Sequence, residues 1–344
     1  MVEIKTSEAV GHVLCHDITQ IIKDKVKGVA FKKGHVVTEE DVDVLLSLGK
    51  DHLYVWEKKE GILHENEAAQ VLRDICINDY MEESDVKEGK IEIFAGIDGL
   101  LKIDVDKLRK VNSLGEMMIA TRHQNFPVKK GDKLAGTRII PLIIEEEKMN
   151  KVKELCGDNP ILSIKPFVHK KVGIVTTGNE VFYGRIKDTF GPVIKNKVNE
   201  FDVDIVGQTI INDDPLKITN AILNFINNDA DLVLCTGGMS VDPDDKTPKA
   251  IKDTGADIVS YGAPVLPGAM MLLSYYKKGE KIIPIVGLPG CVMYARRTIF
   301  DLILPRLMSD EIISKEDLSS LGLGGLCLNC EICNYPNCGF GKGI

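Results

Sequence analysis

The chain has 344 residues, 44% of them hydrophobic, and a formal net charge of −8. This length predicts two or three domains with a sizeable core, while the acidic balance argues against a nucleic-acid-binding protein. The apolar stretches are far shorter than the ~18 residues of a membrane span, and the first ten residues lack the apolar core of a signal peptide, so we expect a cytoplasmic protein with no membrane partner.

The front of the chain predicts a small α+β module over residues 1–78. Residues 39–49 place apolar side chains near helical spacing, and Thr38 is the expected N-cap of that helix. Residues 52–56 predict a strand, and residues 62–78 predict a second helix with its apolar side chains on one face.

A second small α+β module is predicted over residues 79–165. Residues 127–132 combine proline, glycine and charged side chains, which is typical of a turn between strands. The helix of this module is expected at residues 105–112, and its strands are expected at residues 91–94, 100–103, 117–121 and 138–144.

Further along, three glycine-bearing loops each follow a short apolar run. The runs span residues 172–175, 232–235 and 282–286, and the loops span residues 176–180, 236–240 and 287–290. Such runs are typical of buried strands in a parallel sheet. A doubly wound sheet brings the loops at the carboxyl ends of its strands to one edge, where ligands bind. Because glycine lets the backbone approach a ligand and exposed N–H groups can hold a phosphate, we predict a site for a phosphorylated ligand.

Acidic side chains lie in or beside these loops. They are Glu180, Asp188, Asp213, Asp214, Asp242, Asp244 and Asp245. Mg²⁺ prefers carboxylate and phosphate oxygens as ligands, so a cation is expected between this cluster and an anionic ligand. For any single aspartate the alternative is a turn or helix-cap role, because Asp is favoured at both positions.

Six short segments carry a family resemblance. They are TTGNEV (176–181), IKDT (186–189), NDDP (212–215), DLVLCTGGMSVDPDD (231–245), LPG (266–268) and GLPG (287–290). In order and approximate spacing they resemble the molybdopterin-binding domain shared by MogA, MoeA and gephyrin, and are most similar to MoeA-type molybdopterin molybdenumtransferases. The resemblance implies a three-layer α/β domain with a mostly parallel sheet over residues 166–310. Its last helix is expected at residues 293–304, before Pro305.

The resemblance also implies an activity. Relatives of this type bind adenylated molybdopterin, hydrolyse the adenylate with Mg²⁺ and place molybdate on the dithiolene with release of AMP. By resemblance, the catalytic residues are Glu180, Asp214 and Asp245, and the residues that hold Mg²⁺ are Asp188, Asp213 and Asp245. The cofactor-binding residues implied in the same way are Thr177, Gly178, Gly237, Gly238, Ser240, Pro289 and Gly290. A molybdoenzyme partner and a homo-oligomer, either a dimer or a trimer, are further expectations.

Two departures from the family pattern keep other functions open. Residues 267–270 read Pro-Gly-Ala-Met where the family has Pro-Gly-Lys-Pro, and no Ala-Met-Asp-Gly-Tyr-Ala segment precedes Asn150. The alternative is a non-catalytic carrier or regulator that holds the molybdopterin cofactor for a molybdoenzyme, with the tail as a metal or redox sensor. A third candidate is a pyrophosphatase-like relative with the same domain. The retained carboxylates favour an enzyme.

The tail, residues 311–344, is predicted to be a linker followed by a metal site. Its cysteines are Cys327, Cys330, Cys333 and Cys338. This spacing can surround one metal centre, either a [4Fe–4S] cluster or Zn²⁺. A mobile tether is predicted from Gly322, Gly324 and Gly325, and the alternative is a flexible tail with reduced thiols. Outside the tail the cysteines are scattered, as is usual for reduced thiols, and Cys291 is interpreted as a small buried thiol at a helix start.

Overall fold

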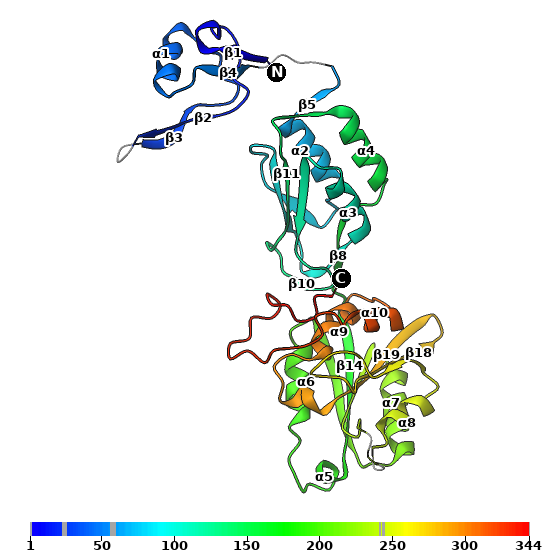
Figure 1. The fold of residues 1–344 in the computed structure, drawn as a ribbon. Coiled ribbons are helices and arrows are strands. Elements are labelled where there is room, and N and C mark those ends of the chain that lie inside the picture. The colour runs from blue at the N-terminus through cyan, green and yellow to red at the C-terminus, as the bar shows by residue number, and fades with distance from the viewer. Residues whose placement is uncertain (1, 23–25, 56–59, 241, 243–244, 344) are drawn as a thin grey trace. The chain divides into compact units, whose positions relative to one another are not determined.

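The computed structural model describes residues 2–22, 26–55, 60–240, 242 and 245–343. They form two compact units, each assembled from several stretches of chain (Figure 1). The front unit comprises Met1–Phe94, Asp104–Thr121 and Lys133–Leu162, and the main unit comprises Ala95–Ile103, Arg122–Asp132 and Ser163–Ile344. Within the described ranges, no helix is both long and apolar enough to cross a membrane.

The N-terminal part of the front unit combines one helix with paired strands. The helix begins at the predicted N-cap, because the backbone nitrogen and hydroxyl of Thr38 both donate to the carboxylate of Asp41, at 2.8 Å and 2.7 Å. This capping box satisfies donors that the first turn would otherwise leave unpaired. The elements are β1 (Val2–Lys5) paired with β4 (His52–Val55), β2 (Ile18–Ile22) paired with β3 (Val26–Phe31), the 3-10 turn Thr6–Glu8 and α1 (Glu39–Ser47).

The rest of the front unit contains a four-stranded sheet in the order β6-β7-β11-β9. The helix predicted over residues 62–78 is shorter, because His64 acts as its N-cap and the residues before it pair as a strand. The strand predicted over residues 138–144 is interrupted at Pro141, since proline cannot donate to the ladder. The elements are β5 (Ile62–His64), α2 (Glu65–Asp74), β6 (Met81–Glu83), β7 (Lys90–Ala95), α3 (Val105–Ser113), β9 (Met117–Thr121), β11 (Lys133–Ile139), β12 (Ile143–Glu145) and α4 (Glu146–Cys156).

A six-stranded, mostly parallel sheet forms the centre of the main unit, which confirms the predicted fold class. The strand order is β15-β14-β16-β19-β18-β17, with parallel pairing from β15 to β19 and antiparallel pairing beyond it. The strands are β14 (Lys170–Thr177), β15 (Val203–Ile211), β16 (Leu232–Thr236), β17 (Asp257–Tyr261), β18 (Leu272–Lys278) and β19 (Lys281–Leu288). The three predicted apolar runs lie inside β14, β16 and β19.

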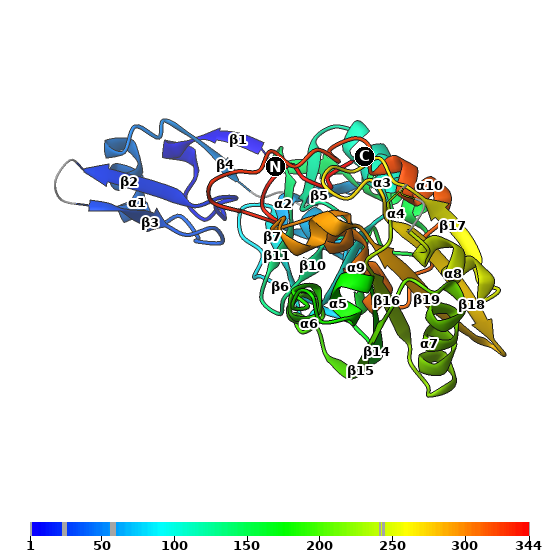
Figure 2. The same cartoon turned by 90° about the horizontal axis from the view of Figure 1, so that it is seen from below.

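Helices cover both faces of this sheet (Figure 2). Side chains alternate along a strand, so Ile174 and Leu234 enter the core beneath α6 and α9, whereas Val175 and Val233 enter the core beneath α7 and α8. The helices are α5 (Asn179–Phe182), α6 (Phe190–Val198), α7 (Pro215–Asn227), α8 (Thr247–Asp253), the 3-10 turn η2 (Gly290–Met293) and α9 (Ile299–Met308). The arrangement is the predicted three-layer α/β architecture.

The prediction for the last helix of this domain, over residues 293–304, is wrong. The helix begins after Thr298, which forms a capping box with Asp301, and it continues through Pro305. Proline removes the hydrogen bond to the carbonyl four residues earlier, here that of Asp301. This carbonyl instead accepts a 3.0 Å hydrogen bond from the hydroxyl of Tyr335, so packing against the tail lets the helix run on.

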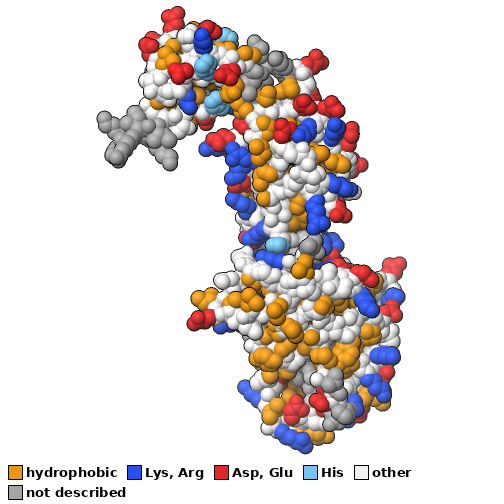
Figure 3. All heavy atoms as spheres, in the orientation of Figure 1, with side chains coloured by type: hydrophobic (Ala, Val, Ile, Leu, Met, Phe, Trp, Pro, Cys, Tyr) orange, Lys and Arg blue, Asp and Glu red, His pale blue; other side chains and the backbone are white. Residues whose placement is uncertain are grey.

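The main unit also contains a small sheet and an ordered C-terminal segment. The small sheet has the order β10-β8-β13, and the segment follows one more short helix. These elements are β8 (Gly99–Ile103), β10 (Pro127–Val128), β13 (Leu162–Pro166) and α10 (Lys315–Ser320). On the face of the main unit that Figure 3 shows, apolar side chains gather in broad areas, and several tail side chains such as Leu328 and Ile332 are exposed.

Candidate functional site

The carboxyl ends of β14 and β16 flank the point where the strand order reverses. From β14 the chain crosses to β15 on one side, and from β15 it returns to β16 on the other side of β14. In open α/β sheets, ligands bind in the crevice outside such a switch point. The loops at Gly178 and Gly237 therefore begin at the edge where a ligand site is predicted.

The double-glycine loop after β16 packs directly on the end of β14. Gly237 has a φ of +85°, and a Cβ atom there would overlap the carbonyl oxygen of Thr177. Gly238 has a φ of +55°, and its Cβ would lie 3.0 Å from Oγ1 of Thr247. Residues with side chains rarely adopt these φ values. Both positions therefore require glycine for the loop conformation itself.

Threonine hydroxyls hold this loop in place. Oγ1 of Thr247 donates to the carbonyl oxygen of Gly237 at 2.8 Å and lies 3.0 Å from Oγ1 of Thr177. Thr177 is predicted to contact the cofactor, but this residue is only 3% exposed. The hydroxyl of Thr177 therefore helps to position the loop through its contact with Thr247. Sequence reasoning missed Thr247. The Thr-Pro pair at residues 247–248 signals a helix start, but nothing in the sequence places it against Gly237.

A cavity of about 500 Å³ lies between the loops that follow β16 and β19. Its volume is in the range of small-molecule sites. The predicted residues that line it are Gly237, Gly238, Ser240, Asp245, Pro289 and Gly290. Three lining residues that sequence reasoning missed are Phe190, Met270 and Tyr294. They carried no signal because single apolar or aromatic residues outside a motif are usually core or surface residues.

Asp188, predicted as a metal ligand, is held by several donors. Its Oδ1 accepts from the backbone nitrogens of Phe190 and Gly191, both at 3.0 Å, and its Oδ2 accepts from Nε2 of Gln208 at 2.7 Å. The same Gln208 nitrogen donates to Oγ1 of Thr176 at 2.9 Å. This network orients the start of α6, whose first residue lines the cavity.

The remaining predicted carboxylates also make local contacts, and they do not line this cavity. Asp214 is the N-cap of α7 and accepts from the backbone nitrogen of Leu216 at 3.0 Å. Asp213 accepts from the backbone nitrogen of Asn179 at 2.9 Å, which joins the loops after β14 and β15. Glu180 is exposed and its carboxylate lies over Gly178. Asp214 thus has the helix-cap contact of the alternative, whereas Asp213 connects two loops, and their predicted roles in catalysis and metal binding stay predictions.

Asp245 is the predicted catalytic carboxylate that lines the cavity. Its Oδ2 accepts from the backbone nitrogen of Asp242 at 3.1 Å. Close by, Tyr261 donates to the carbonyl oxygen of Met239 at 2.9 Å, and burial together with the charge of Asp245 raises the pKa of this phenol. Tyr261 thus remains a protonated donor at neutral pH. In the part of the chain that the structure describes, no three His, Cys, Asp or Glu side chains converge closely enough to hold a metal ion.

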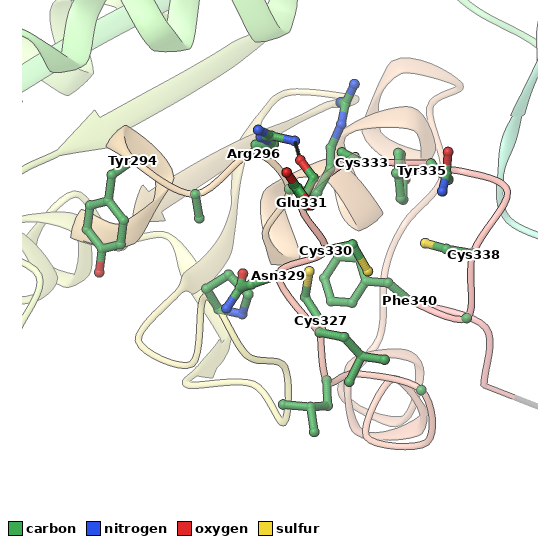
Figure 4. Close-up of a pocket in the computed structure, with 18 residues that line it drawn as sticks. Tyr294, Arg296, Cys327, Asn329, Cys330, Glu331, Cys333, Tyr335, Cys338 and Phe340 are labelled. Atoms are coloured by element: carbon green, nitrogen blue, oxygen red, sulfur yellow. Dashed lines mark hydrogen bonds between the residues drawn. The ribbon is translucent and has the colours of Figure 1, made fainter.

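All cysteines are present as thiols. Cys291 lines the 500 Å³ cavity, is half-buried, and has its pKa raised by burial. The tail cysteines Cys327, Cys330, Cys333 and Cys338 line a different cavity of about 680 Å³ in the main unit (Figure 4). Tyr294 lines both cavities, so the two lie next to each other.

Comparison with known proteins finds matches to parts of the chain. Residues 173–309 match the family model described as "Probable molybdopterin binding domain", and residues 3–57 match one described as a domain of unknown function. A "CinA-like protein" of Mycobacterium marinum is 34% identical over 84 residues, which are 24% of this chain and 20% of that protein. A "Molybdenum cofactor biosynthesis bifunctional protein" of Synechococcus elongatus is 35% identical over 83 residues, 24% of this chain and 26% of that protein. The chain thus spans about a fifth to a quarter of the length of these relatives.

Solved structures with a similar chain include proteins from Pyrococcus furiosus and Thermoplasma acidophilum. The tungsten cofactor synthesizing protein MoaB from Pyrococcus furiosus aligns with a TM-score of 0.32 and 22% identity, covering 36% of this chain and 84% of that one. The protein CinA from Thermoplasma acidophilum, described as of unknown function, aligns with a TM-score of 0.34 and 18% identity, covering 40% of this chain and 98% of that one.

Proposed function

We propose that the 500 Å³ cavity binds molybdopterin or its adenylate, because residues 173–309 match the family model of molybdopterin-binding domains. The observation that carries the proposal is the position of the double-glycine loop. This loop follows β16, one of the two strands at the switch point of the sheet, and it lines the cavity. Gly237 and Gly238 both have positive φ, and successive backbone N–H groups in such conformations can form a concave anion site. The exposed hydroxyl of Ser240 lies in the same loop and can donate to a phosphate oxygen.

The residues at this cavity fit a Mg²⁺ ion that binds together with the ligand. Mg²⁺ keeps several waters and is usually held by one or two carboxylates plus substrate phosphates. Asp245 supplies such a carboxylate beside the proposed phosphate loop. Bound there, the ion would offset the repulsion between Asp245 and the phosphates and polarise the phosphoryl oxygens. Asp188, Asp213 and Asp214 accept from backbone nitrogens of the loops around the site, and any direct role in catalysis or Mg²⁺ binding, for these three or for Glu180, stays a prediction.

We propose that the chemistry at this site is Mg²⁺-dependent release of AMP from the adenylate, coupled to insertion of molybdate. The chain's own residues would bind the phosphate through the glycine loop and orient the adenylate between the loops after β16 and β19. The apolar side chains of Met239, Leu288 and Met293 would exclude water from one side of the ligand. A tail cavity next to the pterin cavity also fits the second candidate, a carrier that holds the finished cofactor for a molybdoenzyme.

Incubation of the full chain with adenylated molybdopterin, Mg²⁺ and molybdate, followed by measurement of AMP, distinguishes the two functions. The enzyme proposal predicts AMP release that depends on both Mg²⁺ and the protein. Tight pterin binding without AMP release would instead support the carrier. A chain that neither binds the pterin nor releases AMP would contradict both.

A further inference from the structure

The C-terminal segment is held against the main unit, in contrast to the mobile tether that its glycines predict. The backbone nitrogen of Leu266 donates to the carbonyl oxygen of Gly325 at 2.8 Å, and the nitrogen of Cys327 donates to the carbonyl oxygen of Leu266 at 2.8 Å. A Cβ atom on Gly325 would lie 2.5 Å from the carbonyl oxygens of Leu321 and Pro264. Glycine is therefore needed here because two backbone segments come into contact.

Two aromatic residues anchor the part of the tail that carries the later cysteines. The hydroxyl of Tyr335 donates to the carbonyl of Asp301, and the guanidinium of Arg297 lies 4.9 Å from the centre of the Tyr335 ring. Phe340 is 4% exposed and belongs to the same core as α9. Cys333 precedes the first anchor by two residues and Cys338 precedes the second by two, so both thiols have fixed surroundings.

The four tail cysteines line one cavity. Cys327, Cys330, Cys333 and Cys338 all line the cavity of about 680 Å³. In Figure 4 the sulfur atoms of Cys327, Cys330 and Cys338 point toward its interior from different stretches of the tail. The segment between residues 327 and 338 thus folds as a loop around the cavity, and a site that the sequence spacing only suggested has a defined location.

The arrangement fits a bulky metal centre better than a single ion. Four thiolates around one Zn²⁺, each at about 2.3 Å from it, would lie roughly 3.8 Å from one another. In the residues described, no three cysteine, histidine or acidic side chains converge closely enough to hold a single metal ion, and the four cysteines line a cavity far larger than one ion. An iron–sulfur cube spreads its four cysteine ligands around its own volume, and the spacing of two residues between the first three thiols suits such a cluster.

The charges at the cavity agree with an anionic occupant. Arg296 and Arg297 both line it, and Nη1 of Arg296 donates to the backbone carbonyl of Glu331 at 2.7 Å, which fixes this guanidinium at the rim. The side chain of Glu331 is the opposing charge there. Four thiolates give a bound metal centre net negative charge, so the guanidinium of Arg296 at the rim would stabilise it. Arg297 is already paired with Asp301 at 2.9 Å and with Glu200 at 3.2 Å.

We propose that Cys327, Cys330, Cys333 and Cys338 ligate a [4Fe–4S] cluster in this cavity. Cys330 and Cys333 are exposed, so the cluster would be open to solvent and sensitive to oxidation. Because Tyr294 lines both this cavity and the 500 Å³ cavity, the cluster would lie next to the proposed pterin site. The proposal itself does not depend on what the second cavity binds.

The test is anaerobic purification of the full chain and reconstitution with ferrous iron and sulfide. We expect about four iron atoms and four sulfide ions per chain, a brown colour with visible absorption, and an electron paramagnetic resonance signal after reduction. Zinc at about one per chain without colour, or no metal with all four tail thiols open to alkylation, would overturn the proposal.

Variants separate ligation from folding. Cys330→Ser and Cys333→Ser change exposed side chains, so the circular dichroism spectrum of the apoprotein should stay unchanged while most of the iron and the visible absorption are lost. Cys291→Ser, which changes a thiol in the neighbouring cavity, is the matched control and should keep full iron content. Equal iron content in the parent and in both tail variants would refute ligation by these cysteines.

Discussion

The hydroxyl of Tyr335 donates a 3.0 Å hydrogen bond to the carbonyl oxygen of Asp301, an acceptor that Pro305 leaves without its helical partner. The contact joins a buried helix to the C-terminal segment across 34 residues of sequence. It explains two features together: why α9 tolerates an internal proline, and why the cysteine-bearing tail is ordered beside the domain.

We predict that Tyr335→Phe lowers the free energy of unfolding by about 1–3 kcal/mol, because it leaves the Asp301 carbonyl without a partner in a buried helix. Urea denaturation of the parent and the variant measures the difference. Tyr183→Phe removes a hydroxyl from an exposed tyrosine of the same unit and should change stability by less than about 0.5 kcal/mol. Equal losses in both variants would show that the Tyr335 contact does not hold the tail.

A second prediction concerns the acid stability of the main unit. Glu311 accepts from Arg306 at 3.1 Å and 3.2 Å and from Lys102 at 2.6 Å. Burial raises the pKa of Glu311, but these hydrogen bonds outweigh burial and lower it below its usual value. A lowered folded-state pKa contributes stability above the unfolded pKa of about 4.3, and this contribution is lost as the pH falls through the folded value.

Glu311→Gln should therefore destabilise the protein by about 1–3 kcal/mol at pH 7, and the difference from the parent should shrink as the pH falls below about 4. Thermal unfolding over a series of pH values measures it. Glu316→Gln changes an exposed carboxylate nearby and should follow the parent at every pH. A difference between Glu311→Gln and the parent that is constant with pH would contradict the role assigned to this carboxylate.

The third prediction concerns the carboxylate at the pterin cavity. Asp245→Asn should lower the kcat/KM for Mg²⁺-dependent AMP release at least about tenfold, because an amide is a weaker ligand for Mg²⁺ and cannot neutralise it. The fold should be retained, since the residue is only partly buried. Asp253→Asn, an exposed carboxylate in the adjoining helix α8, should keep the parent rate. Full Mg²⁺-dependent activity in Asp245→Asn would remove this residue from the proposed site.

Much of the main unit could be predicted because its signals are local. The apolar runs inside β14, β16 and β19 are buried on both faces, and such strands appear in a sequence as continuous hydrophobic stretches. The edge strand Asp257–Tyr261 and its neighbour Leu272–Lys278 were not predicted. The first is largely exposed, and the two pair antiparallel across the loop of residues 262–271. Their placement depends on pairing rather than on a pattern within either segment.

What the sequence could not show are contacts between distant segments. Thr247 bonds Gly237 across the loop, and Tyr335 bonds Asp301 from the tail, although neither residue belongs to a recognisable motif. The carboxylates show the same point. Asp213 and Asp214 lie in a motif that suggests metal binding and catalysis, and these roles stay predictions, but the motif does not indicate that one oxygen of each accepts from a backbone nitrogen, that of Asn179 or Leu216. A motif predicts that residues lie near a site, while the direction of each side chain depends on the fold around it.

The central claim, that the double-glycine loop holds the phosphate of a molybdopterin, is tested most directly by a binding titration with Gly238→Val. The parent should bind molybdopterin, followed by pterin fluorescence under anaerobic conditions. Gly238→Val should bind at least about tenfold more weakly, a loss of about 1.4 kcal/mol, because its side chain meets Oγ1 of Thr247 and Oγ1 of Thr177 and so displaces the loop that would hold the phosphate. The control is Gly279→Val, which imposes a similar strain at a φ of +62° in a turn where a Cβ atom meets no neighbour. Affinity lost in Gly238→Val and kept in Gly279→Val is the predicted result, and equal affinity in the parent and both variants would contradict the account.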